Sequence, residues 1–160
     1  MNLELIHINL ITLNLILIME PLTVAGTLDS LSAIAKYVVA AAADAGLDKK
    51  ASYRLRLAVD EIASNIIIHG YDEACLSGDV DLQATIDRKT LTISIEDTAV
   101  NYDPCAQETP DNLDKPIELR PHGGLGVYLA IQGVDKFMYE RVGDRNRNIF
   151  VMNRPVPEGS

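Results

Sequence analysis

A carboxylate and a carboxamide one helical turn apart are the first candidates for chemistry in this 160-residue chain. Glu61 and Asn65 lie in the segment DEIASNIIIHGY, where a four-residue separation places both on the same face of a helix. An amide oxygen is a hard, neutral ligand suited to Mg²⁺, and a carboxylate can orient or deprotonate a nucleophile. Such a pair also arises by chance on a solvated helix face, so it needs support from elsewhere in the chain.

Two further motifs follow along the chain and supply that support. Asp97, in the segment IEDTAVNYDP, comes just after the apolar alternation of a predicted strand ends. A carboxylate there can accept a hydrogen bond from an exocyclic amine such as that of adenine. Gly123, Gly124 and Gly126 open a predicted helix in PHGGLGVYLA, where backbone N–H groups can approach phosphate oxygens. Each motif alone has an ordinary alternative, a turn-forming aspartate or a flexible hinge. Their combination indicates a nucleotide site.

Periodicity in the first half of the chain predicts one strand and two helices that position Glu61 and Asn65. The strand covers residues 21–25, and both helices have apolar residues at helical spacing. The first helix is predicted to be capped by Thr27 or Asp29 and to stop at Gly46. The second is predicted to begin after Asp48 and to be closed by Gly70.

Four strands, one helix and a long loop are predicted in the second half. Residues 80–86 and 91–95 alternate apolar and polar side chains around a turn, which is typical of a hairpin. The aperiodic stretch 98–124 contains four prolines, and loops of this length usually bind or cover a ligand. A helix over 125–132 and strands over 134–142 and 149–152 complete the chain. The predicted fold is an α+β two-layer sandwich, with a mostly antiparallel sheet covered on one face by three helices.

Composition excludes several classes of protein. The 14 basic and 23 acidic residues give 14 − 23 = −9, and a surface this acidic repels phosphate backbones, so we expect no nucleic-acid partner. A hydrophobic fraction of 48% is enough for a buried core. The two cysteines have no metal-binding spacing and fit a reducing cytoplasm.

The apolar extension at residues 1–18 is a separate problem. Polar interruptions such as Glu4 and Asn9 argue against a membrane-spanning helix, and the first basic residue is Lys36, which argues against a signal peptide. We therefore expect no membrane association. The segment is either an extra edge strand, which would favour dimerisation, or sequence upstream of a true start at Met19. A compact domain is predicted over 19–154, with a tail over 155–160.

The order of the motifs carries a family resemblance. ExxxN on a helix, a stretch close to DxGxxFDP after a strand, and GGxG before a helix resemble the signature of the gyrase, heat-shock chaperone, histidine kinase and mismatch-repair ATPases, which share the Bergerat fold. Within this superfamily the chain is most similar to bacterial anti-sigma-factor serine/threonine kinases, over about residues 20 to 153. The segments that carry this similarity are LTVAGTLDSLSAIAKYV, LRLAVDEIASNIIIHGY, IEDTAVNYDP and HGGLGVYLAIQGVDKFMYER.

The resemblance implies ATP and Mg²⁺ as cofactors and gives each motif a role. Asn65 would hold Mg²⁺ against the phosphates, Glu61 would act as general base, and Asp97 would bind the adenine amine. The residues that would wrap the phosphates are Gly123, Gly124, Leu125 and Gly126.

Two positions of the implied nucleotide site depart from the family pattern. Ala99 replaces the usual glycine and adds a methyl group where the backbone lies against the base, which predicts weaker nucleotide binding. Tyr102 replaces the usual phenylalanine and keeps the aromatic ring.

The implied function is an ATP·Mg-dependent kinase that phosphorylates a small anti-anti-sigma (STAS-type) protein and sequesters a sigma factor in the cytoplasm. The resemblance also favours a homodimer. The alternative is a nucleotide-gated binding module without phosphotransfer; Glu61 favours the kinase, and Ala99 leaves room for the module. P-loop ATPases and eukaryotic-type kinases are excluded, because the chain contains no GxxxxGK[ST], HRD or DFG motif.

Overall fold

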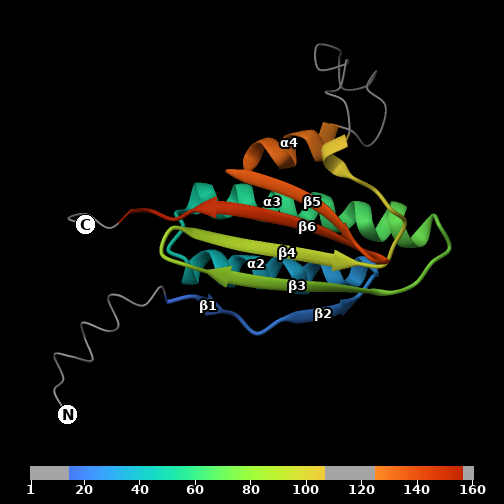
Figure 1. Cartoon of the computed structure of the whole chain (residues 1–160), viewed down its shortest axis with the longest axis horizontal. Coiled ribbons are helices and arrows are strands. Elements are labelled where there is room, and N and C mark those ends of the chain that lie inside the picture. The colour runs from blue at the N-terminus through green and yellow to red at the C-terminus, as the bar shows by residue number, and fades with distance from the viewer. Residues whose placement is uncertain (1–14, 107–124, 157–160) are drawn as a thin grey trace.

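An open, six-stranded antiparallel sheet forms one layer of the computed structural model, which describes residues 15–106 and 125–156 (Figure 1). The strands run in the order β1-β3-β4-β6-β5, and β2 also pairs with β3. Their bounds are β1 Leu17–Ile18, β2 Leu22–Ala25, β3 Asp79–Ile86, β4 Thr90–Asp97, β5 Lys136–Val142 and β6 Arg145–Asn153.

The second layer consists of helices on one face of this sheet (Figure 1). The long helices are α2 (Leu31–Asp44) and α3 (Lys49–Asn65), and α4 (Leu125–Gly133) packs against α3. Three short segments complete the described helices: the 3₁₀ turns η1 (Leu28–Ser30) and η3 (Pro104–Ala106), and the π-helix η2 (Ile66–Asp72). The predicted α+β sandwich is confirmed.

Alternation along the strands explains why only one face of the sheet is covered. In β3, β4 and β6 every second residue is buried, which turns one row of each strand toward the helices. The apolar members of these rows are Val80, Leu82, Ala84, Ile86, Leu91, Ile93, Ile95, Phe150 and Met152. Toward one end of β4 and β6 the same rows continue with polar residues, and this end of the sheet contributes to the candidate site.

The start of the first helix differs from the prediction. A 3₁₀ turn precedes α2, and Thr27 makes no side-chain capping bond, while Asp29 lies inside the turn. The other predicted boundaries agree better with the structure. Gly46 follows α2 with a φ of +75°, a left-handed conformation that glycine adopts easily, and Asp48 caps α3 by accepting the Ala51 N–H at 2.7 Å.

The predicted end of the second helix at Gly70 is wrong. Instead of stopping, the helix widens into η2, which continues to Asp72. Ile67 and Tyr71 are both buried in this segment, so the wider turns keep two large side chains in the core. The Tyr71 hydroxyl donates to the Asp79 carbonyl at 2.7 Å and accepts the Thr98 N–H at 3.0 Å, which attaches η2 to the residues around β3 and β4.

The final hairpin also begins at different residues from those predicted. Strand β6 starts at Arg145 rather than at residue 149, and β5 starts at Lys136 rather than at residue 134. The residues 145–148 are all polar, so no apolar alternation marked them as strand. They are nevertheless paired with β4 in regular register, with Asn146 opposite Asp97 and Asn148 opposite Ile95.

At the N-terminal edge, Leu17 and Ile18 pair with Ile86 and Thr85 of β3, so an extra edge strand is present for these two residues. Residues 1–14 lie outside the described part of the chain. None of the described helices is long and apolar enough to cross a membrane.

Candidate functional site

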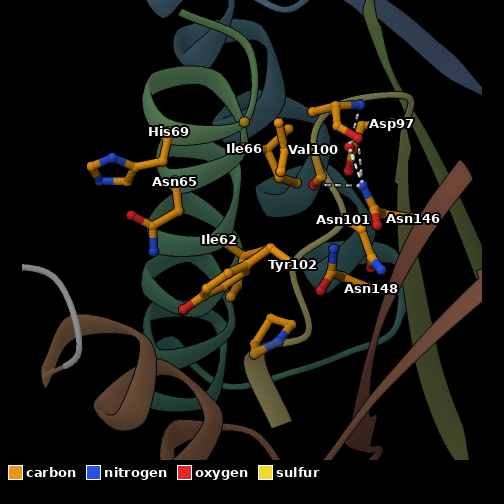
Figure 2. Close-up of a pocket in the computed structure, with 13 residues that line it drawn as sticks. Ile62, Asn65, Ile66, His69, Asp97, Val100, Asn101, Tyr102, Asn146 and Asn148 are labelled. Carbon is orange, nitrogen blue, oxygen red and sulfur yellow. Dashed lines mark hydrogen bonds between the residues drawn. The ribbon is translucent and has the colours of Figure 1, made fainter. Parts of the chain in front are cut away.

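A pocket lies between the helical layer and one end of the sheet, and Figure 2 shows its two walls. Asn65 and His69 lie on the helical wall, and Asp97, Asn146 and Asn148 lie on the sheet wall. The remaining lining residues come from α3, η2 and the segment after β4: Ile62, Ile66, Gly70, Ala99, Val100, Asn101, Tyr102 and Pro104.

Asp97 lines this pocket and has one carboxylate oxygen without a hydrogen-bond partner. It is the last residue of β4 and belongs to the buried row, so the alternation continues through Asp97 rather than ending before it. The residue is only 1% exposed. Its Oδ1 accepts the Ala99 N–H and an N–H of Asn146, both at 2.9 Å, whereas its Oδ2 has no partner. Buried polar atoms are rarely left unpaired, so this atom is a fitting acceptor for a ligand amine.

Burial raises the pKa of Asp97 above its ordinary value, because the charged form loses its hydration. The hydrogen bonds from Asn146 and Ala99 act in the opposite direction, as do the charges of Arg145 and Arg141. These donors and charges therefore offset part of the free-energy cost of removing the carboxylate from water.

Asn146 and Asn148 were missed by the sequence analysis. Asn146 donates to Asp97 Oδ1 at 2.9 Å and to the carbonyls of Ala99 and Val100, both at 3.2 Å (Figure 2). Asn148 is 2% exposed, and its Oδ1 is a second buried acceptor without a partner. The only sequence signal was the alternation Arg-Asn-Arg-Asn over residues 145–148, which has no apolar member to reveal the strand.

Ala99 is buried against the helical wall of the pocket. A Cβ placed on Gly70 would lie 2.7 Å from the Ala99 Cβ, so the alanine methyl group fits because residue 70 has no side chain. The Val100 N–H also donates to the Gly70 carbonyl, at 3.3 Å. Tyr102 lines the pocket while 42% of its surface stays exposed, and partial burial raises the pKa of its hydroxyl.

The predicted pair on α3 is divided between two environments. Asn65 is half-buried and lines the pocket, whereas Glu61 is not among the lining residues. Glu61 instead lies against the first turn of α4, because a Cβ on Gly126 would overlap its Oε1 and lie 2.6 Å from its Cδ. Leu125 is the first residue of α4, and Gly123 and Gly124 lie outside the described residues.

The donor set fits a nucleotide with a weakly held divalent cation better than a permanent metal centre. Within residues 15–106 and 125–156 there is no cluster of three or more His, Cys, Asp or Glu that could hold a metal ion. Mg²⁺ commonly takes one or two protein ligands and completes its shell with phosphate oxygens and water. Asn65, on the helical wall, can supply one such oxygen.

The structure thus combines an open antiparallel sheet, helices on one of its faces, and a pocket lined by a carboxylate with one unpaired oxygen at the end of a strand. The family model of the Histidine kinase-like ATPase domain matches residues 24–153. The chain therefore belongs to the histidine kinase-like ATPase family, and the predicted superfamily is confirmed.

The chain is also similar to two known proteins. A region of 78 residues is 30% identical to Serine-protein kinase RsbW of Bacillus cereus (strain G9842), covering 47% of this chain and 48% of the relative. The chain thus spans about half the length of this curated relative. The crystal structure of the RsbU and RsbW domains of a Mycobacterium tuberculosis protein is similar in fold, with a TM-score of 0.56 at 15% identity over 89% of this chain and 35% of the other.

Proposed function

We propose that this protein is an ATP·Mg²⁺-dependent serine/threonine protein kinase of the anti-sigma type. The observation that carries the proposal is the unpaired Oδ2 of Asp97, a buried acceptor that the 6-amino group of adenine can satisfy. Family membership and the similarity to a serine-protein kinase support the same activity.

The proposed roles follow from where the residues lie. Asp97 binds the adenine amine, with Ala99 and Tyr102 beside the base. Asn65 holds Mg²⁺, which when bound neutralises charge on the phosphates. The phosphates are proposed to lie against the residues around the start of α4: Gly123, Gly124, Leu125 and Gly126.

Glu61 is the proposed general base. Its carboxylate lies against Gly126, beside the helix terminus proposed to face the phosphates, and it is one helical turn from Asn65. A base at this point can accept the proton of a serine or threonine hydroxyl as the hydroxyl attacks the γ-phosphate. Phosphoryl transfer needs mainly positioning and charge neutralisation from the protein, so one carboxylate is sufficient.

The proposed partners are a small anti-anti-sigma (STAS-type) protein as substrate and a sigma factor that is sequestered, both in the cytoplasm. The net charge of −9 suits a partner with basic regions. A homodimer is also proposed, because Leu15, Ile16, Leu17 and Ile18 are all more than half exposed at the edge of the sheet.

Transfer of label from γ-labelled ATP·Mg²⁺ into a lysate of the source cells tests this function. We expect the unmodified protein to label one small protein on serine or threonine. Glu61→Gln should bind ATP but lose transfer, whereas the control Asp60→Asn, on the exposed face of α3, should remain active. A fully active Glu61→Gln variant would remove Glu61 from the role of base.

The alternative function is a nucleotide-gated binding module without transfer. Ala99, which lines the pocket where the family pattern has glycine, favours it. ATP binding by calorimetry with no labelled product, from fully folded protein, would select this alternative over the kinase.

A further inference from the structure

Behind Asp97, two residues of β5 that belong to none of the three nucleotide motifs contact Asn146. The carboxamide of Asn146 lies between Asp97 on one side and two donors of β5 on the other. Its Oδ1 accepts from the Tyr139 hydroxyl at 2.7 Å and from Arg141 Nη1 at 3.0 Å. The Tyr139 hydroxyl also lies 2.7 Å from Asn101 Oδ1, and its one proton serves one of these two oxygens at a time. Arg141 can only donate, so the NH₂ group of Asn146 has to face Asp97.

This orientation determines which oxygen of Asp97 is left unpaired. The Asn146 NH₂ group and the Ala99 N–H both donate to Oδ1, which leaves Oδ2 without a partner in the protein. If the Asn146 amide turned over, its oxygen would meet the carboxylate, and two acceptors would repel each other. Tyr139 and Arg141 therefore act on the ligand side of the pocket through Asn146.

We propose that Asn146, oriented by Tyr139 and Arg141, is a positioning residue that keeps Asp97 an ionised acceptor and thereby makes the site selective for a 6-amino purine over a 6-oxo purine. The proposal rests on the proposed ATP site. An ionised carboxylate can only accept, so it pairs with the adenine amine and repels the oxygen at position 6 of hypoxanthine. A protonated carboxyl group can donate to that oxygen, which removes the discrimination.

Several charged and titratable groups surround Asp97 and affect how its protonation depends on pH. Arg145 and Arg141 lower its pKa, and Tyr139 lies behind Asn146. On the helical side, His69 lines the pocket and pairs with Glu73, and the Tyr71 hydroxyl contacts the adjacent residue Thr98. Burial already raises the pKa of Asp97, and the hydrogen bond from Asn146 opposes this rise. Without that bond the carboxyl group protonates at a higher pH.

The test compares the affinities for ATP and inosine triphosphate by calorimetry from mildly acidic to neutral pH. The two nucleotides have the same phosphates, so effects of Mg²⁺ on the phosphate end cancel in their ratio. We expect the unmodified protein to prefer ATP by about tenfold or more, as a lost hydrogen bond to a charged group predicts. In Asn146→Ala the preference should shrink toward unity, and it should be lost at a higher pH than in the unmodified protein.

Two further variants keep the test decisive. Asn153→Ala removes an exposed asparagine at the other end of β6 and should behave as the unmodified protein. Tyr139→Phe combined with Arg141→Gln leaves Asn146 in place but frees its amide to turn, so it should lose selectivity even if Asn146→Ala does not fold. Titration of the Asp97 carboxyl carbon by NMR in the nucleotide-free proteins should show the same upward shift of its pKa.

The outcomes separate this inference from the proposed function. ATP binding with the same pH profile and the same preference in all four proteins would overturn the role of Asn146 and leave the proposed function intact. No binding of either nucleotide by the folded, unmodified protein would overturn the ATP site itself, and the role of Asn146 with it.

Discussion

Near the start of β6, the polar residues on the two faces of the strand have different surroundings. Arg145 and Arg147 point to the open face of the sheet, where they pair with Asp81, Glu96 and Glu140. Asn146 and Asn148 alternate with them and point into the buried pocket. On the open face the two arginines are paired with carboxylates and partly exposed, whereas in the pocket two acceptors have no partner in the protein. Ion pairs in water contribute little to stability, while an unpaired buried acceptor costs free energy unless a ligand satisfies it. The inward face therefore has the properties of a binding site, and the outward face those of an ordinary surface.

The largest expected effect is that of Asp97→Asn. Its amide would place an N–H donor where the bare acceptor stood, so ATP affinity should fall by about 10- to 100-fold. Glu96→Gln, the preceding residue on the outward face, is the matched control and should change ATP affinity little. Isothermal calorimetry measures both, and equal losses in the two variants would contradict the distinction between the faces.

The same substitution should act on stability with a definite dependence on pH. The pKa of Asp97 is raised in the folded protein, so the fold binds a proton more tightly than the unfolded chain does. Asp97 therefore lowers stability as pH rises from the unfolded pKa through the higher folded pKa. Nucleotide-free Asp97→Asn should accordingly lose less stability over that interval than the unmodified protein. Thermal unfolding across acidic pH checks this, and parallel curves for the two proteins would count against it.

A smaller effect is expected at the helical wall. Gly70→Ala would bring two methyl carbons within 2.7 Å, and overpacking of this kind destabilises by about 1–3 kcal/mol. Adding Ala99→Gly should restore most of the loss, because it removes the opposing methyl group. Gly133→Ala is the matched control, since its nearest neighbours would be 3.9 Å away. Denaturant unfolding measures the cycle, and strict additivity of the two substitutions would rule out the contact.

Asn148→Ala tests the second unpaired acceptor on the inward face of β6. Its Oδ1 has no partner in the protein, so removal should leave the fold as stable as before or slightly more stable. If the carboxamide contacts the base, ATP affinity should fall several-fold, which corresponds to roughly 1 kcal/mol for one hydrogen bond. Calorimetry together with thermal unfolding separates the two effects. A large loss of stability would show that Asn148 has a structural role instead.

The smallest effect is expected for Arg147→Gln on the outward face. Its partly exposed pairs with Glu96 and Glu140 should contribute about 0–1 kcal/mol, and less at high salt. Nucleotide affinity should not change. Unfolding curves at low and high salt test this, and a loss that does not depend on salt would argue for packing by the arginine stem rather than charge.

The success of the sequence analysis depended on apolar periodicity. The β3–β4 hairpin and the bodies of α2 and α3 were predicted because their apolar residues recur at strand or helix spacing. Asp97 and Asn65 were predicted as pocket residues from motifs, and the structure brings both to one cavity. The roles of Glu61 and of the glycines before α4 stay predictions.

The failures occurred where polar residues take core positions or where packing overrides a local signal. Strand β6 starts four residues earlier than predicted, because its inward residues there are asparagines and gave no apolar signal. Gly70 suggested a helix end, but the contact with Ala99 requires glycine inside η2. A glycine needed for close approach and a glycine that ends a helix cannot be distinguished in a single sequence.

The sequence by itself determined the α+β class, the helix and strand order and the family, since these depend on periodicities and motifs that local spacing encodes. Only the tertiary structure decided how the pocket around Asp97 is built. Strand pairing brings Asn146 of β6 opposite Asp97 of β4, and the next strand supplies Tyr139 and Arg141 to orient it. These contacts join residues 5 to 49 positions apart, and they form only because each residue faces a particular side of its strand. That choice follows from register, which is set by the packing of the whole sheet against its helices.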